Sequence, residues 1–167
     1  MVKEVLVGDY LSEQMIEAGA NLLRQLDQLG LQIDAALWFY NADAIRWKLV
    51  LAMPETSLKG PRQAYSRLQA ALQTMEAPIV ALQHITAVDS DAPLILSLKS
   101  ILRSGIDVAG YRLTRAVIGG MYIDDAYIYR LERNEGEKKV HTSVSTNKPP
   151  SAKRTPTRPR AHVNNRP

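Results

Sequence analysis

The chain has 167 residues, of which 46% are hydrophobic and 23% charged, and both values are ordinary for a soluble globular protein. Cysteine is absent, which excludes disulfide scaffolds and cysteine-ligated zinc or iron–sulfur centres. The longest apolar runs, such as 35–40, are far shorter than the roughly 20 residues that a membrane span needs, so we expect no membrane partner. The N-terminal apolar stretch is too short for a secretory signal, and we therefore expect a cytoplasmic protein.

The net charge of +4 comes from the C-terminal end of the chain. Residues 1–134 hold 13 Lys and Arg against 15 Asp and Glu, whereas residues 135–167 hold eight against two. The second segment also holds five of the nine prolines and none of the ten aromatic residues. Such a composition buries too little apolar surface to offset an ordering entropy of roughly 1–2 kcal/mol per residue. We therefore predict one folded domain over 1–134 and a disordered basic tail over 135–167.

Apolar periodicity and turn residues predict the element order α-β-β-α-β-α-β-β in the domain. The helices are expected over 12–29, from Pro61 to just before Pro78, and from Pro93 to about Arg103. The strands are expected over 33–40, 45–53, 82–88, 110–117 and 121–131, with a further short strand open over 3–7. Ser12 or Asp9 is expected to cap the first helix, and Gly30 to end it. We predict an α+β fold in which one five-stranded mixed or antiparallel sheet carries helices mostly on one face.

The usual motifs for metal, nucleotide and catalytic sites are weak or absent. Asp89 and Asp91 have the spacing of two carboxylates that hold Mg²⁺, but residues just before Pro93 are also typical of a helix cap and an Asx turn, which we favour. His84 is expected to be a structural, hydrogen-bonded histidine, because no G-x-S-x-G motif supplies a nucleophile. No glycine-rich phosphate loop is present. We therefore expect no metal and no cofactor.

A turn centred on Gly119-Gly120 sets the register of the last hairpin. The polar cross-strand pairs are then Arg115 with Asp124, Thr114 with Asp125, and Arg112 with Tyr127. The pair of opposite charges is expected to stabilise the sheet by roughly 0.2–1 kcal/mol, so structure alone is one explanation of these residues. Adjacent Asp124 and Asp125 should point to opposite faces, which argues against a two-carboxylate metal centre.

The other explanation of the last hairpin is a site for an anion. Arg112 has no acidic partner in the predicted register, and an unpaired guanidinium suits a phosphate or a carboxylate. The residues of this hypothetical anion site are Arg112, Thr114, Arg115, Asp125 and Tyr127. We expect Arg115→Ala to cost stability and Arg112→Ala to weaken ligand binding.

The first hairpin carries large aromatic side chains. If its facing positions sum to 85, Trp38 lies opposite Trp47, and Tyr40 lies opposite Ile45. We favour a core packed under a helix, because large aromatic residues dominate core burial. The alternative is an exposed stacking surface of the kind used by single-strand binders. That surface would consist of Trp38, Tyr40, Arg46, Trp47 and Lys48.

Two functional hypotheses follow from these features. The first is a non-catalytic binding protein, whose sheet recruits a protein partner or a second copy and whose tail binds nucleic acid or another anionic partner weakly and in a salt-sensitive way. The alternative is an enzyme that acts on a phosphorylated or nucleic-acid substrate. It would use Arg112, Arg115 and one of Asp124 or Asp125.

Overall fold

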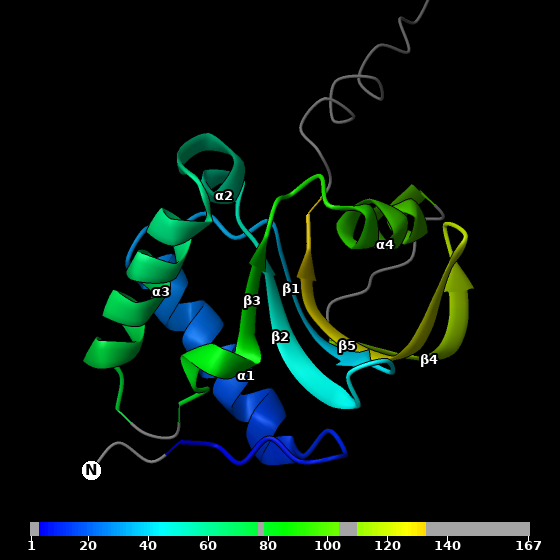
Figure 1. Ribbon diagram of the computed structural model, residues 1–167, viewed down its shortest axis with the longest axis horizontal. Helices are drawn as coiled ribbons and strands as arrows, with labels where there is room; N and C mark the ends of the chain where they lie inside the picture. Colours follow the sequence, from blue (N-terminus) through cyan, green and yellow to red (C-terminus); the bar gives the residue numbers. More distant parts are fainter. Residues whose placement is uncertain (1–3, 77–78, 104–109, 133–167) are drawn as a thin grey trace, which may run out of the picture. The chain divides into compact units, whose positions relative to one another are not determined.

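The structure is a computed structural model that describes residues 4–76, 79–103 and 110–132. The predicted basic tail over 135–167, and the domain boundary before it, lie outside these residues and stay predictions. No helix in the described part is long and apolar enough to cross a membrane. Figure 1 gives the element labels used below.

The described residues form helices and strands in the predicted order. The helices are α1 (Glu13–Gln28), α2 (Pro54–Lys59), α3 (Pro61–Thr74), the 3-10 helix η1 (Leu82–His84) and α4 (Pro93–Arg103). The strands are β1 (Ala35–Asn41), β2 (Arg46–Ala52), β3 (Ile85–Val88), β4 (Tyr111–Ile118) and β5 (Met121–Leu131). Helix α2 was not expected, and the third strand is short because its first residues form η1. In place of the short strand that the sequence left as an alternative over 3–7, the structure has one isolated parallel bridge between Glu4 and Ile79.

The five strands form one mixed sheet in the order β3-β2-β1-β5-β4. Neighbouring strands are antiparallel except β2 and β3, which are parallel. Strands β3 and β4 are therefore the two edges. The predicted α+β class with a five-stranded mixed sheet is confirmed.

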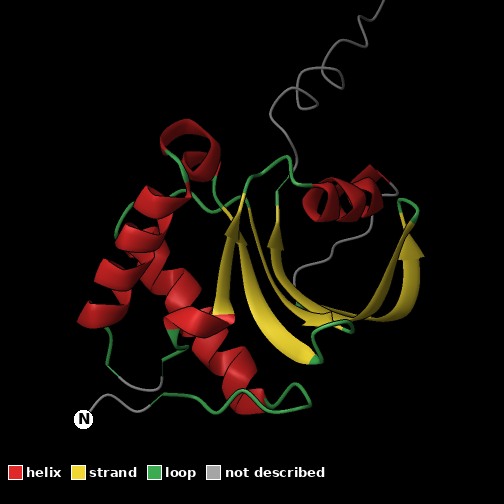
Figure 2. Cartoon of the chain, viewed as in Figure 1, coloured by secondary structure: helices red, strands yellow, loops and turns green. Residues whose placement is uncertain are grey.

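Helices cover both faces of this sheet (Figure 2). Two of the longer helices, α1 and α3, share one face, and α4 lies on the other. Alternate residues of β2 feed the two cores: Trp47, Leu49 and Leu51 pack with α1 and α3, whereas Val50 and Ala52 pack with α4. A strand that is covered on both faces has no polar side to show, which explains the continuous apolar run of β1.

Helix α1 begins at the predicted cap and lies very close to the sheet. Ser12 accepts a hydrogen bond from the Met15 backbone N–H at 3.2 Å. Two aromatic side chains donate to the helix backbone. Trp38, which is fully buried, donates from Nε1 to the Met15 carbonyl at 3.0 Å, and Tyr129, which is partly buried, donates from Oη to the Ile16 carbonyl at 2.6 Å. Burial raises the pKa of the Tyr129 hydroxyl far above its usual range, so this donor keeps its proton.

The register predicted for the first hairpin is wrong. Tyr40 lies opposite Trp47, and Trp38 lies opposite Leu49. The turn occupies 42–45, because Ile45 leaves the strand with a φ of 48°. The Asn41 side chain holds this turn by accepting from the Ala44 N–H at 2.9 Å.

The predicted aromatic core is confirmed, and the exposed stacking surface is wrong for both tryptophans. Trp38 is 0% exposed and Trp47 is 2% exposed, because α1 and α3 cover their face of the sheet. The other three members of that hypothetical surface, Tyr40, Arg46 and Lys48, are at least partly accessible.

Candidate functional site

The last hairpin has the predicted register but an unexpected break in its middle. Thr114 lies opposite Asp125, and Arg112 lies opposite Tyr127, as the Gly-Gly turn predicts. Arg115 has no partner in the ladder of strand pairs, because its backbone is left-handed, with a φ of 47°. A left-handed conformation is unusual for a residue with a side chain and costs about 1–2 kcal/mol.

Opposite the break at Arg115, both aspartates lie on the same side of β5. Ala126 and Ile123 both belong to the core under α4, although they are three positions apart and strict alternation would separate them. The two residues between them are therefore displaced together toward the opposite face. Asp124 and Asp125 line one cleft, so the expectation that they point to opposite faces is wrong.

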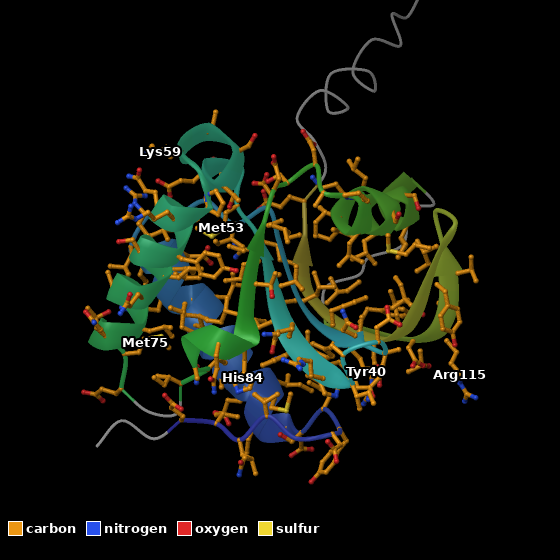
Figure 3. All side chains as sticks on the ribbon, in the orientation of Figure 1. Tyr40, Met53, Lys59, Met75, His84 and Arg115 are labelled. Carbon is orange, nitrogen blue, oxygen red and sulfur yellow. The ribbon has the colours of Figure 1, made fainter. Side chains whose placement is uncertain are left out.

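This cleft, called the hairpin cleft below, has a volume of about 370 Å³ and lies between β4–β5 and the segment before α1. It is lined by Asp9, Tyr10, Tyr40, Trp47, Arg112, Thr114, Arg115, Asp124 and Asp125. Tyr40 comes from the end of β1 and contacts the Trp47 ring at 5.4 Å between ring centroids. The side chain of Arg115 reaches outward from β4 (Figure 3).

The ion pair of this hairpin is formed by Arg112, whereas the sequence predicted one for Arg115. Arg112 forms a bidentate ion pair with Asp125, with Nε–Oδ1 at 3.0 Å and Nη2–Oδ2 at 2.7 Å. The hydrogen bonds that Arg112 donates to the Asp125 carboxylate raise the pKa of its guanidinium above the usual value. Arg115 forms no hydrogen bond or ion pair with any described residue. The register points Arg112 at Tyr127, but its long side chain reaches the diagonal carboxylate instead.

Other candidate residues lie outside the hairpin cleft. Tyr127 packs edge-on against Tyr129, with ring centroids 5.1 Å apart, next to the core under α1. Asp89 accepts from the Asp91 N–H at 3.4 Å, as in the Asx turn that we favour. Within the described ranges, no three His, Asp or Glu side chains gather closely enough to hold a metal ion.

A second hollow of about 310 Å³ adjoins the hairpin cleft, and Asp9 and Trp47 line both. We call it the basic pocket, because Arg46, Lys48 and His84 also line it. His84 does not lie in a strand as expected but at the end of η1, directly before β3. Figure 3 shows His84, Tyr40 and Arg115 along the same end of the sheet.

No family model, curated protein or solved structure matches the chain. Function therefore has to be argued from the chemistry of the two hollows. The hairpin cleft offers one unpaired guanidinium, carboxylates, a hydroxyl and phenol rings. Histidine, cysteine, serine and lysine are missing from its lining residues.

Because Arg112 forms an ion pair and Arg115 forms none with a described residue, replacing the two arginines should affect stability differently. Arg112→Ala should lower the free energy of unfolding by up to about 1 kcal/mol, since it removes a partly exposed ion pair. Arg115→Ala should leave it unchanged, and Arg115→Gly should raise it slightly, because glycine relieves the left-handed strain. Urea unfolding of the three variants measures this order. An equal loss for both alanine variants would mean that Arg115 has a structural partner.

Proposed function

We propose that this is a non-catalytic binding protein whose hairpin cleft holds a small polar anion. The observation that carries the proposal is Arg115, an unpaired arginine held in a strained backbone conformation on a concave surface. Strain of this kind persists only where the surrounding structure maintains it, and it is concentrated at functional sites.

The other lining residues suit a ligand that carries hydroxyl or amino groups besides its charge. Arg115 offers a planar fork of donors that matches a carboxylate or a phosphate. The Asp124 carboxylate accepts hydrogen bonds from ligand donors, and the Thr114 hydroxyl donates or accepts. Arg112 and Asp125 pair with each other, and both line the cleft. Anion binding is therefore assigned to Arg115 in place of Arg112.

Citrate, which carries carboxylates and a hydroxyl, is a suitable probe. We expect citrate to shift the amide NMR resonances of Thr114 and Asp124. Arg115→Gln should weaken binding about tenfold or more, because a charge-assisted hydrogen bond contributes about 1.5–3 kcal/mol. Arg62→Gln, an exposed change on α3, is the matched control and should bind as the unaltered chain does. Unchanged spectra at tens of millimolar citrate would contradict the proposal.

An enzyme acting on a phosphorylated or nucleic-acid substrate is the second candidate. It is favoured by Asp9 and Asp124, two carboxylates that line the same cleft without an ion pair to any residue described. Carboxylates can act as general acid and base. Turnover of p-nitrophenyl phosphate or of single-stranded RNA that Asp124→Asn abolishes, and that Arg62→Gln does not change, would support an enzyme. No turnover of either substrate would contradict it.

We also propose that the basic tail adds weak attraction to nucleic acid. From residue 138 onward it carries eight basic residues and no acidic one. Each phosphate neutralised contributes about −0.9 to the slope of log K against log salt on duplex DNA. A chain ending at residue 134 should lose this binding and keep its melting temperature. Binding that survives truncation, or a melting temperature that falls by many degrees, would contradict the proposal.

A further inference from the structure

We infer that Arg46, Lys48 and His84 form a phosphate-binding site in the basic pocket. This site is separate from Arg115 and stands without the function proposed for the hairpin cleft. Its three side chains come from two neighbouring elements, β2 and the turn of η1 that leads into β3.

The sheet brings the three side chains together. Arg46 and Lys48 are two positions apart on β2, so they lie on the same side of the strand. Strands β2 and β3 run parallel, with Leu49 opposite Ile85. His84 directly precedes Ile85, and it therefore stands beside Lys48 at the start of the parallel pair.

Hydrogen bonds to backbone carbonyls hold the two charged groups and leave most of their donors available. Lys48 Nζ donates to the Gln83 carbonyl at 2.5 Å, and Arg46 Nε donates to the Ala44 carbonyl at 3.2 Å. An ammonium has three donors and a guanidinium has five, so both groups keep further N–H bonds for a ligand. Neither forms an ion pair with another residue of the described part. The site is thus partly preorganised.

The electrostatic environment of the pocket favours an anion. Burial, and then the charge of Lys48, lowers the pKa of His84, and Arg46 acts in the same direction. Glu4 opposes this effect, and the Asp9 carboxylate also lines the pocket. The two basic side chains, Arg46 and Lys48, still outnumber the one lining carboxylate. A bound anion would relieve the repulsion between them, while neutral His84 donates one ring N–H.

A strained residue marks this pocket, as one marks the hairpin cleft. Among the described residues, Ile45 and Arg115 are the two with side chains and a positive φ. Ile45 lines the basic pocket and is 71% exposed, so burial does not account for its conformation. A β-branched residue at φ 48° is a clear outlier. Its conformation ends the turn and starts β2 at Arg46.

Phosphate fits these donors better than a carboxylate does. A planar carboxylate is satisfied by one arginine fork, whereas a tetrahedral phosphate has three or more oxygens to distribute over separate donors. The ammonium, the guanidinium and the imidazole are three such donors, and all three side chains line one hollow. The volume of about 310 Å³ is ample for a phosphate group.

Titration of the full chain with inorganic phosphate, followed residue by residue by NMR, tests this site. We expect shifts at Arg46, Lys48 and His84, and a higher pKa of the His84 ring in phosphate, because the bound anion stabilises the imidazolium. Lys48→Gln should weaken binding at these residues about tenfold or more. Arg46→Gln should do the same at an exposed position that carries little risk to folding, and Arg62→Gln should have no effect.

Two further arms separate the sources of the phosphate group. A nucleoside monophosphate presents a phosphate monoester, and a short single-stranded oligonucleotide presents phosphate diesters. The ligand that shifts the resonances of Arg46, Lys48 and His84 at the lower concentration identifies the kind of phosphate that the site binds. No shift with phosphate, or full binding by both glutamine variants, would overturn the inference. If the anion site proposed for the hairpin cleft is wrong, that result would be seen separately, because citrate would leave the resonances of Thr114 and Asp124 unchanged.

Discussion

Replacing Ile95 with alanine is expected to lower the free energy of unfolding by about 2–5 kcal/mol, the usual cost of deleting a fully buried aliphatic side chain. Ile95 is 0% exposed and lies in the core between α4 and the sheet. This core is distinct from the one under α1 and α3, with which it shares no residue. A large loss would therefore demonstrate that the second face of the sheet is a full core.

The neighbouring residue provides the control. Leu96 lies on the same helix but is 46% exposed, so Leu96→Ala should change stability by no more than about 0.5 kcal/mol. Leu98→Ala, at another fully buried position of α4, should repeat the large effect. Denaturant unfolding of the three variants gives the comparison. Equal, small losses at Ile95 and Leu96 would mean that α4 does not cover the sheet in solution.

Gly19→Ala is expected to destabilise the protein by about 1–3 kcal/mol, although alanine is the better helix former by about 1 kcal/mol. A methyl group at Gly19 would lie 3.0 Å from Trp38 Nε1 and 2.9 Å from the ring carbon Cζ of Tyr129. It would also contact the Tyr129 hydroxyl. Both rings donate hydrogen bonds to the helix backbone, so α1 has to move away and lose those bonds.

Two comparisons show whether close approach is the cause. A Cβ at Gly8 meets nothing within 4 Å, so Gly8→Ala should be nearly neutral. Tyr129→Phe removes the atom that lies nearest the added methyl, and in this background Gly19→Ala should cost less. Thermal unfolding measures the unaltered chain, the three single variants and the double variant. If Gly19→Ala is as stable as the unaltered chain, the contact between α1 and the sheet is looser than described here.

The sequence predicts the strand pairing well where a turn contains residues that favour it, such as a pair of glycines. The Gly119-Gly120 pair predicted the register of the last hairpin correctly, because glycine accepts the positive φ that a tight turn requires. The first hairpin lacks such a pair. Its turn ends in a left-handed isoleucine, which sequence preferences disfavour, and the predicted register was therefore off by two positions.

The candidate site was predictable in its location and not in its contacts. Of the five residues of the hypothetical anion site, Arg112, Thr114, Arg115 and Asp125 line the hairpin cleft, whereas Tyr127 does not. Neither the ion pair between Arg112 and Asp125 nor the left-handed backbone of Arg115 has a signal in the sequence. The contribution of Asp9 and Tyr10 comes from a segment more than 100 positions earlier in the chain, and only the tertiary structure brings it to the cleft.

The break at Arg115 also bears on self-association through the edge of the sheet. Strand β4 is an outer strand, and an outer strand with a long regular run of free backbone groups invites another chain to pair with it. The left-handed residue divides that run into 111–114 and 116–118. The opposite edge, β3, is only four residues long. Among the described residues, both edges of the sheet therefore have features, a short strand or a broken one, that discourage pairing with another chain.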